Sequence, residues 1–186
     1  MRSVASSSAQ GDATDIVLVD LPAFREQRRL RIDRFRAKDA LSVTDGWIVV
    51  GDARSGCNDR HAAAYTVASD GTVAPLWRDA SPFDTFGRGL RKSAGAIEIV
   101  AHARRSVAIR EEATAVQVPD FSTMRGGDEG YLSGEVFSVR LSAQGREERR
   151  DFVGAGLPVV PMGMVSIGER SAIFGTVGGR PLWMAR

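Results

Sequence analysis

Two histidines and a single cysteine are the side chains of this sequence best suited to acid–base or nucleophilic chemistry near neutral pH. His102 comes at the end of the apolar run 97–101, and Asp52 holds the matching place after the run 47–51. An arginine lies two residues beyond each of them, so we expect these side chains to line one rim of the molecule. We take Asp52, His102 and Glu135 as the candidate catalytic residues. The alternative is structural, because a repeated fold needs the same turn or salt bridge in each copy.

Cys57 is the only cysteine, so no disulfide can form within the chain. It lies in the loop 54–59, four residues before His61, and a thiol and an imidazole at this spacing could meet. We favour an incidental loop cysteine. The sequence has no Gly-x-Ser-x-Gly motif, phosphate-binding loop or His-Glu-x-x-His pattern, and the acids of the segment 110–133 match no calcium loop. We therefore predict neither a metal nor a cofactor.

The composition, with 43% hydrophobic and 26% charged residues in a chain of 186, is typical of one soluble globular domain. Residues 1–14 are small and polar, which predicts a disordered segment before a domain at 15–186. The basic residues are 23 arginines and two lysines (25 − 2 = 23), and most arginine pairs have acids nearby. This mixture does not predict a nucleic-acid surface. We find no signal-peptide pattern and no apolar stretch of about 18 residues, so we expect no membrane partner, and the compartment is left open.

The sequence contains three copies of one pattern. Val50–Arg54 aligns with Val100–Arg104 at a displacement of 50 residues, and Ile99–Ala101 aligns with Ile173–Gly175 at a displacement of 74. The difference, 74 − 50 = 24, corresponds to a polar, glycine-containing insertion at 110–133. Each copy is interpreted as a hairpin followed by two further strands, and the copies cover 15–54, 62–105 and 135–176.

The segments Asp45–Gly51 (DGWIVVG) and Asp70–Trp77 (DGTVAPLW) resemble the repeats of bacterial β-propellers. The resemblance implies an all-β fold of three four-stranded antiparallel repeats similar to propeller blades. Because a propeller typically closes with about four to eight blades, three copies predict an incomplete ring. The missing blades would come from a second copy of the chain, as a homo-oligomer, or from a longer parent chain. A β-sandwich or barrel is the alternative fold.

Trp77 and Trp183 each end a Pro-Leu-Trp segment. Tryptophans on a rim can stack on ligands, but a placement that recurs favours packing between repeats. We therefore expect both indoles in the core.

The insertion 110–133 is the segment we expect to contact a partner, because insertions in repeat scaffolds form loops that often lie on the binding face. Phe121, Met124, Arg125 and Tyr131 would anchor a protein or carbohydrate ligand. The scarcity of histidine and the missing nucleophile motif favour a non-catalytic binding or assembly module. The alternative is a hydrolase-type enzyme, or a fragment of one, with its active site at the propeller opening.

Overall fold

The chain folds into antiparallel β-sheets, and the computed structural model has no helix among the residues it describes. The all-β expectation is thus confirmed. Short β-branched runs such as Ile48–Val50 form the strands, because branched side chains pack well on a pleated, buried surface. The residues described are 3–10, 13–20, 22–23, 25–55, 59–81, 84–93, 95–106, 131–132, 136–153, 159–167, 170–177 and 180–185.

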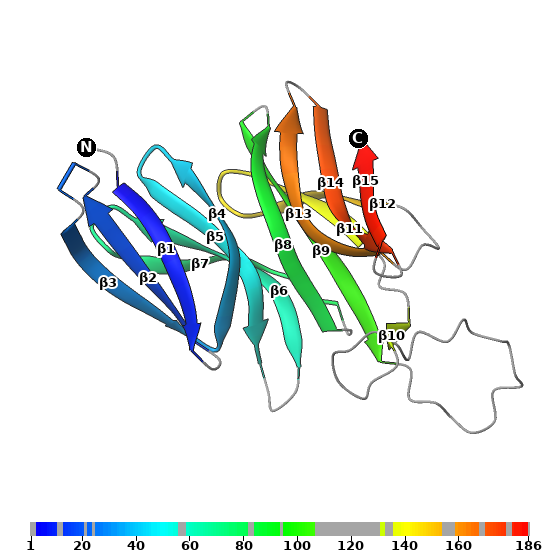
Figure 1. Ribbon diagram of the computed structural model, residues 1–186, viewed down its shortest axis with the longest axis horizontal. Helices are drawn as coiled ribbons and strands as arrows, with labels where there is room; N and C mark the ends of the chain where they lie inside the picture. Colours follow the sequence, from blue (N-terminus) through cyan, green and yellow to red (C-terminus); the bar gives the residue numbers. More distant parts are fainter. Residues whose placement is uncertain are drawn as a thin grey trace, which may run out of the picture.

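The strands form four sheets, which we number I to IV along the chain (Figure 1). Sheet I contains β1 (Ser3–Gln10), β2 (Ala13–Asp20) and β3 (Arg25–Asp33). Sheet II contains β4 (Phe35–Val43), β5 (Gly46–Arg54), β6 (Arg60–Ala68) and β7 (Val73–Arg78). Sheet III contains β8 (Asp84–Ser93), β9 (Ala96–Ser106), β11 (Val136–Leu141) and β12 (Glu147–Val153), with the short β10 (Tyr131–Leu132) paired to β9. Sheet IV contains β13 (Val159–Ile167), β14 (Arg170–Val177) and β15 (Arg180–Ala185).

The four sheets stack face to face in chain order, and apolar side chains fill each gap (Figure 1). Val49 packs toward sheet I and Val50 toward sheet III, because successive side chains of a strand point to opposite faces. In the same way Ile99 faces sheet II and Val100 faces sheet IV. The two middle sheets are therefore apolar on both faces.

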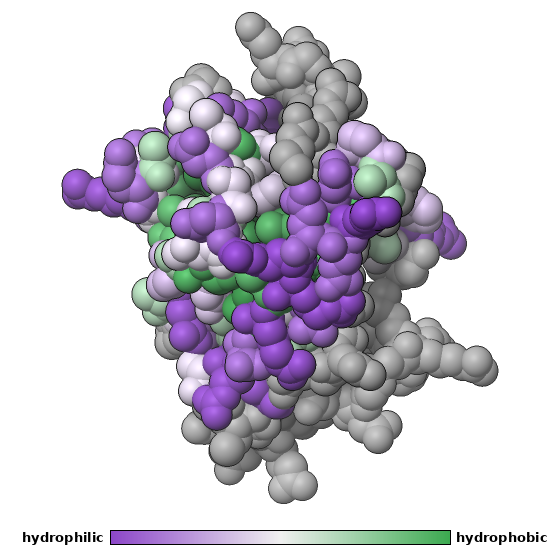
Figure 2. All heavy atoms as spheres, turned by 90° about the vertical axis from the view of Figure 1, so that its left-hand side faces the viewer, coloured by the Kyte–Doolittle hydropathy of each residue, from purple (hydrophilic) through white to green (hydrophobic). Residues whose placement is uncertain are grey.

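The outer face of sheet I, which no other described sheet covers, carries charged pairs. Arg31 lies 2.8 Å from Asp33 and 3.9 Å from Asp15, and Arg29 lies 2.9 Å from Glu26. Figure 2 shows this side of the molecule, with hydrophilic side chains over much of it and apolar ones between them. This face is suited to contact with water.

The first two strands of sheets II, III and IV form hairpins with the same irregularity. Each hairpin has a β-bulge that leaves one residue of its first strand unpaired: Lys38 in β4, Arg88 in β8 and Met162 in β13. Lys38 and Arg88 are 50 residues apart, and Arg88 and Met162 are 74 apart, as in the sequence alignment. A bulge bends its strand and re-aims a side chain, so the three hairpins share a local shape.

Backbones approach closely beside these bulges. A Cβ added to Gly87 would lie 2.7 Å from the carbonyl oxygen of Gly51 in sheet II. One added to Gly89 would lie 2.8 Å from the backbone nitrogen of Met164 in sheet IV. Real Cβ atoms do not approach backbone so closely, so both positions of β8 need glycine at this sheet spacing.

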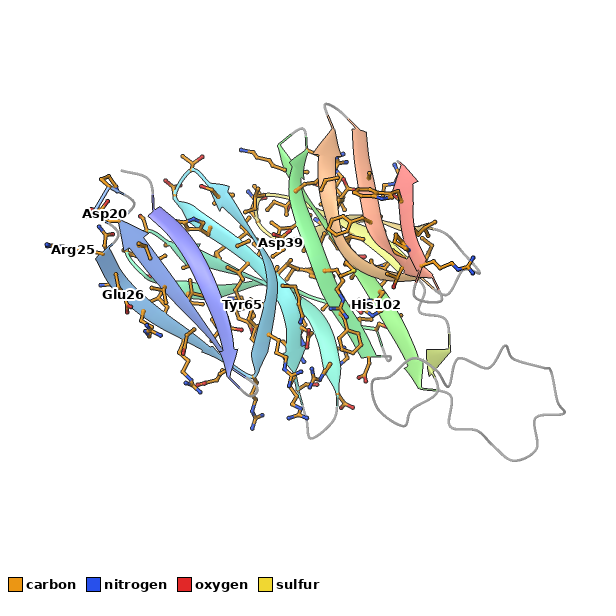
Figure 3. All side chains as sticks on the ribbon, in the orientation of Figure 1. Asp20, Arg25, Glu26, Asp39, Tyr65 and His102 are labelled. Atoms are coloured by element: carbon orange, nitrogen blue, oxygen red, sulfur yellow. The ribbon has the colours of Figure 1, made fainter. Side chains whose placement is uncertain are left out.

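Polar side chains also join neighbouring sheets through backbone groups. The Asp39 carboxylate of β4 accepts a hydrogen bond from the Leu90 N–H of β8 at 3.0 Å, and Figure 3 shows Asp39 near β8. The buried Thr14 hydroxyl of β2 donates to the Phe35 carbonyl at 2.7 Å and accepts from the Ala37 N–H at 3.0 Å. These bonds satisfy backbone groups outside the sheet ladders.

Each expected copy of the repeat contributes strands to two sheets. The copies at 15–54, 62–105 and 135–176 contain β2–β5, β6–β9 and β11–β14 respectively. The last two strands of one copy share a sheet with the first two of the next, as β4 and β5 do with β6 and β7, and β5 pairs with β6 where the copies meet. One sheet is therefore shared by two copies, and sheets I and IV at the ends have only three strands.

Two further segments can be compared with the sequence. The range 1–14, for which we expected disorder, instead contains β1 and the start of β2, which pair along their length. A small, polar strand can join a sheet through its backbone without contributing to a core. The insertion 110–133 lies outside the described residues apart from β10, which pairs with Arg105 and Ser106.

Candidate functional site

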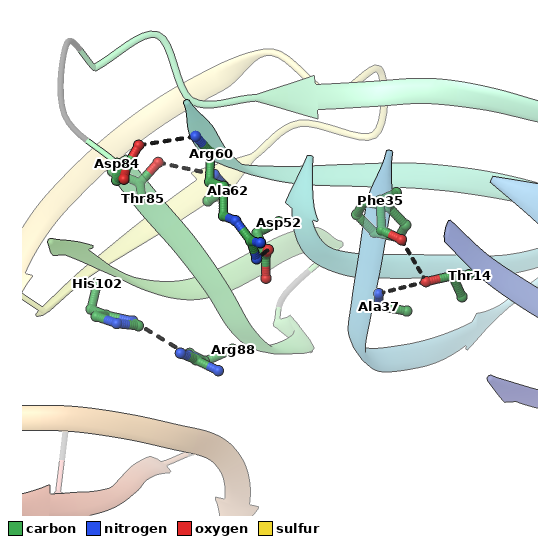
Figure 4. Close-up of polar contacts among 10 residues, drawn as sticks. All are labelled: Thr14, Phe35, Ala37, Asp52, Arg60, Ala62, Asp84, Thr85, Arg88 and His102. Carbon is green, nitrogen blue, oxygen red and sulfur yellow. Dashed lines mark hydrogen bonds and ion pairs between the residues drawn. The ribbon is translucent and has the colours of Figure 1, made fainter. Parts of the chain in front are cut away.

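Side chains from sheets II and III lie around the bulge of β8 and form what we call the Arg88 cluster, of which Figure 4 draws every member except Phe86. Its members are Asp52 of β5, Arg60 of β6, Phe86 and Arg88 of β8, and His102 of β9. The bulge makes Arg88 the extra residue of its strand. Its side chain is thereby released from the regular alternation of β8.

Asp52 is 4% exposed and forms an ion pair with Arg60, whose Nη1 lies 3.1 Å from its Oδ2. The Arg60 backbone N–H donates to the Asp84 carboxylate at 2.9 Å, and the Ala62 N–H donates to the buried Thr85 hydroxyl at 2.9 Å. Two backbone N–H groups at the start of β6 are thus hydrogen-bonded to side chains of β8. The carboxylate of Asp52 is held in a structural contact.

His102 is 8% exposed and is enclosed by two neighbours of β8. Its ring stacks on Phe86, with centroids 5.1 Å apart and planes at 25°. Its Nδ1 accepts a hydrogen bond from Arg88 Nε at 3.4 Å, so the ring proton of this neutral arrangement is on Nε2. The imidazole therefore orients the guanidinium.

Arg88 is the charged centre of the cluster. Burial lowers the pKa of its guanidinium, and the negative charge of Asp52 opposes this shift. Its Cζ lies 5.7 Å from the centroid of the Phe86 ring, within the range of a cation–π contact. The structure thus holds a half-buried cation between an aromatic ring and an imidazole.

A second polar cluster, which we call the Arg150 interlock, joins sheets II and III. Arg150 of β12 binds both carboxylate oxygens of Glu147, at 2.8 and 2.9 Å, and reaches across to Asp79 at 2.8 Å. The Trp77 indole N–H donates to Glu147 at 3.2 Å, and the Phe137 ring lies under the guanidinium at 4.8 Å. The hydrogen bonds from Arg150 lower the pKa of Glu147, and those to Glu147 and Asp79 raise the pKa of Arg150.

The outer face of sheet IV carries aromatic side chains. Phe174 and Trp183 are opposite each other on β14 and β15, with ring centroids 5.5 Å apart. Trp183 is 64% exposed, so our expectation of a core position for it is wrong. Trp77 is buried as expected, at 9% exposure. The difference arises because sheet III covers Trp77, whereas no described sheet covers the face that carries Trp183.

The sequence candidates fall into two groups. Asp52 and His102 lie on different sheets; His102 accepts a hydrogen bond from Arg88, and the negative charge of Asp52 raises the pKa of the same guanidinium. Of the remaining candidates, Tyr131 is the first residue of β10. The others lie outside the described residues: Phe121, Met124, Arg125 and Glu135.

Sequence reasoning missed Arg88 and Arg150. The only signal for Arg88 in the sequence is the repeat alignment, which places it at the same position as Lys38 and Met162. This position is recognisable as special only when the structure shows a bulge there. Arg150 and Asp79 are 71 residues apart, so their contact depends on sheet packing.

Comparisons with known proteins give no family assignment: no protein-family model matches the chain, and no curated protein matches it in sequence. Within the described ranges, no group of three or more His, Cys, Asp or Glu residues could hold a metal ion. The same residues include no helix long and apolar enough to cross a membrane.

Proposed function

We propose that this chain is a non-catalytic assembly module with a β-propeller-like scaffold, and that it binds a second copy of itself through the outer face of sheet IV. The observation that carries the proposal is the aromatic pair on that face, the half-buried Phe174 and the exposed Trp183. Large exposed apolar groups on a flat sheet are typical of an interaction surface.

Sheet stacking supports the propeller-like part of the proposal. Sheets II, III and IV repeat one bulged hairpin at displacements of 50 and 74 residues. The place of contact between neighbouring sheets recurs as well. Asp39 of sheet II accepts a hydrogen bond from the Leu90 N–H of sheet III, and the equivalent residues Gly89 of sheet III and Met164 of sheet IV lie close together. A repeated sheet-to-sheet relation is what a propeller requires.

Equivalent positions support the choice of sheet IV. Val50, Val100 and Phe174 occupy one position of the repeat, at the same displacements of 50 and 74. Val50 and Val100 are both 0% exposed, and each packs against the following sheet. Phe174 is only half-buried. The position is covered by the following sheet in sheets II and III, whereas no described sheet covers it in sheet IV.

The partner face follows from charge. The outer face of sheet I carries Arg29 and Arg31 with their acidic partners, and burying these ion pairs against Trp183 would cost desolvation. Contact with the face of sheet IV that carries Phe174 and Trp183 in a second copy would not require the desolvation of these ion pairs. A two-fold arrangement that pairs sheet IV with sheet IV is self-complementary and closed.

The catalytic alternative has weaker support. Asp52 is held by Arg60, and His102 is held by Phe86 and Arg88, so both candidates are engaged in packing contacts. An assembly role needs only the rigid scaffold that these contacts provide.

The test is the mass of the purified chain in solution by light scattering. We expect twice the chain mass of 20.0 kDa at micromolar concentrations, with dissociation on dilution. A mass of one chain at all concentrations would overturn the proposal.

A further inference from the structure

We propose that the Arg88 cluster is a binding site for a small oxyanion, a carboxylate or phosphate group, which the Arg88 guanidinium holds beside the bulge of β8. The site is separate from the outer face of sheet IV and does not depend on assembly through that face.

The place of Arg88 in the fold is the first argument. Lys38 and Met162 occupy the same bulge position in sheets II and IV, and both side chains are exposed, Met162 at 62%. Arg88 alone of the three is half-buried, and it is held in one orientation by Phe86 and His102. Fixing a long cationic side chain in this way costs conformational entropy, which a purely solvated arginine would not lose.

The hydrogen-bonding capacity of Arg88 is the second argument. A guanidinium donates from Nε and from both terminal nitrogens. Nε is used by the Nδ1 of His102. Among the described residues, no acceptor is bonded to the terminal nitrogens of Arg88, which form the fork that matches the two oxygens of a carboxylate or phosphate.

The electrostatic balance is the third argument. Burial disfavours the charge on Arg88, which lowers its pKa, and the opposing influence comes from Asp52. Asp52 is itself paired with Arg60 at 3.1 Å, so the one carboxylate that offsets the burial of Arg88 is already bound to another guanidinium. An added oxyanion would give Arg88 a counter-charge of its own. The Phe86 ring supplies an apolar wall that lowers the local dielectric and strengthens the attraction.

The experiment titrates the intact chain with inorganic phosphate and, separately, with succinate, at constant ionic strength, by isothermal calorimetry. The wild type should show saturable binding of at least one of the two anions. Saturation by phosphate alone or succinate alone would identify the preferred oxyanion. Arg88→Met should weaken that binding at least tenfold, because the fork is lost while the length of the side chain is kept.

Two further variants make the result specific. Arg149→Met removes an exposed arginine of β12, 69% exposed, and should bind the anion as the wild type does. His102→Ala keeps the charge of Arg88 but removes the acceptor that orients it, and should weaken binding by a smaller factor. Circular dichroism melts check that each variant is folded. If Arg88→Met does not fold, the arginine Nε–H resonances of the wild type are followed by NMR, and the Arg88 signal should shift with anion concentration.

Three results would overturn the proposal. One is no saturable binding of either anion to the wild type. Another is equal affinity in wild type and Arg88→Met. The third is an equal loss in Arg149→Met, which would indicate non-specific attraction to surface charge.

Discussion

Arg150 joins two sheets through contacts with both the buried Asp79 and the exposed Glu147. Asp79 is 2% exposed, so removing Arg150 leaves a carboxylate unpaired in the interior. We expect Arg150→Met to lower the free energy of unfolding by about 3 kcal/mol, measured by urea denaturation. The neighbouring Arg149 pairs with Asp151 at the surface, and Arg149→Met should cost less than about 1 kcal/mol. Equal losses in the two variants would show that the interlock adds nothing to ordinary surface pairing.

The same interlock predicts a pH dependence. The pKa of Glu147 is lowered in the folded chain, chiefly by its hydrogen bond from Arg150. The stability that its ionised form contributes is therefore present above its usual pKa of 4.5 and is lost as the pH falls through the lower folded value. We expect Glu147→Gln to lower the Tm near pH 7, with a difference from wild type that shrinks toward about pH 3. Glu148→Gln, at an exposed pair with Arg140, is the control, and it should show almost no difference at either pH. A Glu147→Gln deficit that is constant with pH would contradict this account.

At the residue scale, the sequence indicated equivalent places for Asp52 and His102 but not their partners. The displacement of 50 residues can be read from the sequence, since Asp52 and His102 each follow an apolar run. The contacts with Arg60, Arg88 and Phe86 depend on which strands pair and on where a bulge falls, and neither is encoded in a local pattern.

At the element scale, the glycines of β8 set the distance between sheets. Gly87→Ala would place a methyl group 2.7 Å from the Gly51 carbonyl oxygen, so sheets II and III would have to separate. We expect a loss of about 2 kcal/mol in the free energy of unfolding, measured in urea. Gly95 provides the control, because it has a φ of +79° with no atom within 4 Å of an added Cβ. Gly95→Asn should cost much less, since asparagine tolerates that backbone conformation. A Gly87→Ala protein as stable as Gly95→Asn would show that the sheets are not closely spaced there.

The strands themselves were largely predictable. Runs of β-branched residues and turn glycines at Gly71 and Gly145 indicate strands and tight turns, and these two glycines have φ values of +89° and +79°. Membership of a sheet was not predictable in the same way. Each expected copy begins in one sheet and ends in the next, because strand pairing is a long-range choice that local propensity does not decide. The first strand was missed because Ser3–Gln10 has no apolar alternation.

At the scale of the whole molecule, the two ends of the stack differ in chemistry. Sheet I presents ion pairs to its outer side, whereas sheet IV presents Phe174 and Trp183. Sequence alone predicted an incomplete repeat array but gave no reason to prefer one end. The preference comes from exposure, since Trp77 is covered and Trp183 is not.

Light scattering on two matched variants tests the central claim, assembly through sheet IV, most directly. Trp183→Lys changes the exposed face of sheet IV, and Phe152→Lys changes an equally exposed aromatic residue on sheet III, since the two are 64% and 62% exposed. We predict a two-chain mass for the wild type and for Phe152→Lys, and a one-chain mass for Trp183→Lys, at the same micromolar concentration. A wild type that stays at one chain, or a Trp183→Lys variant that keeps the two-chain mass, would contradict the account.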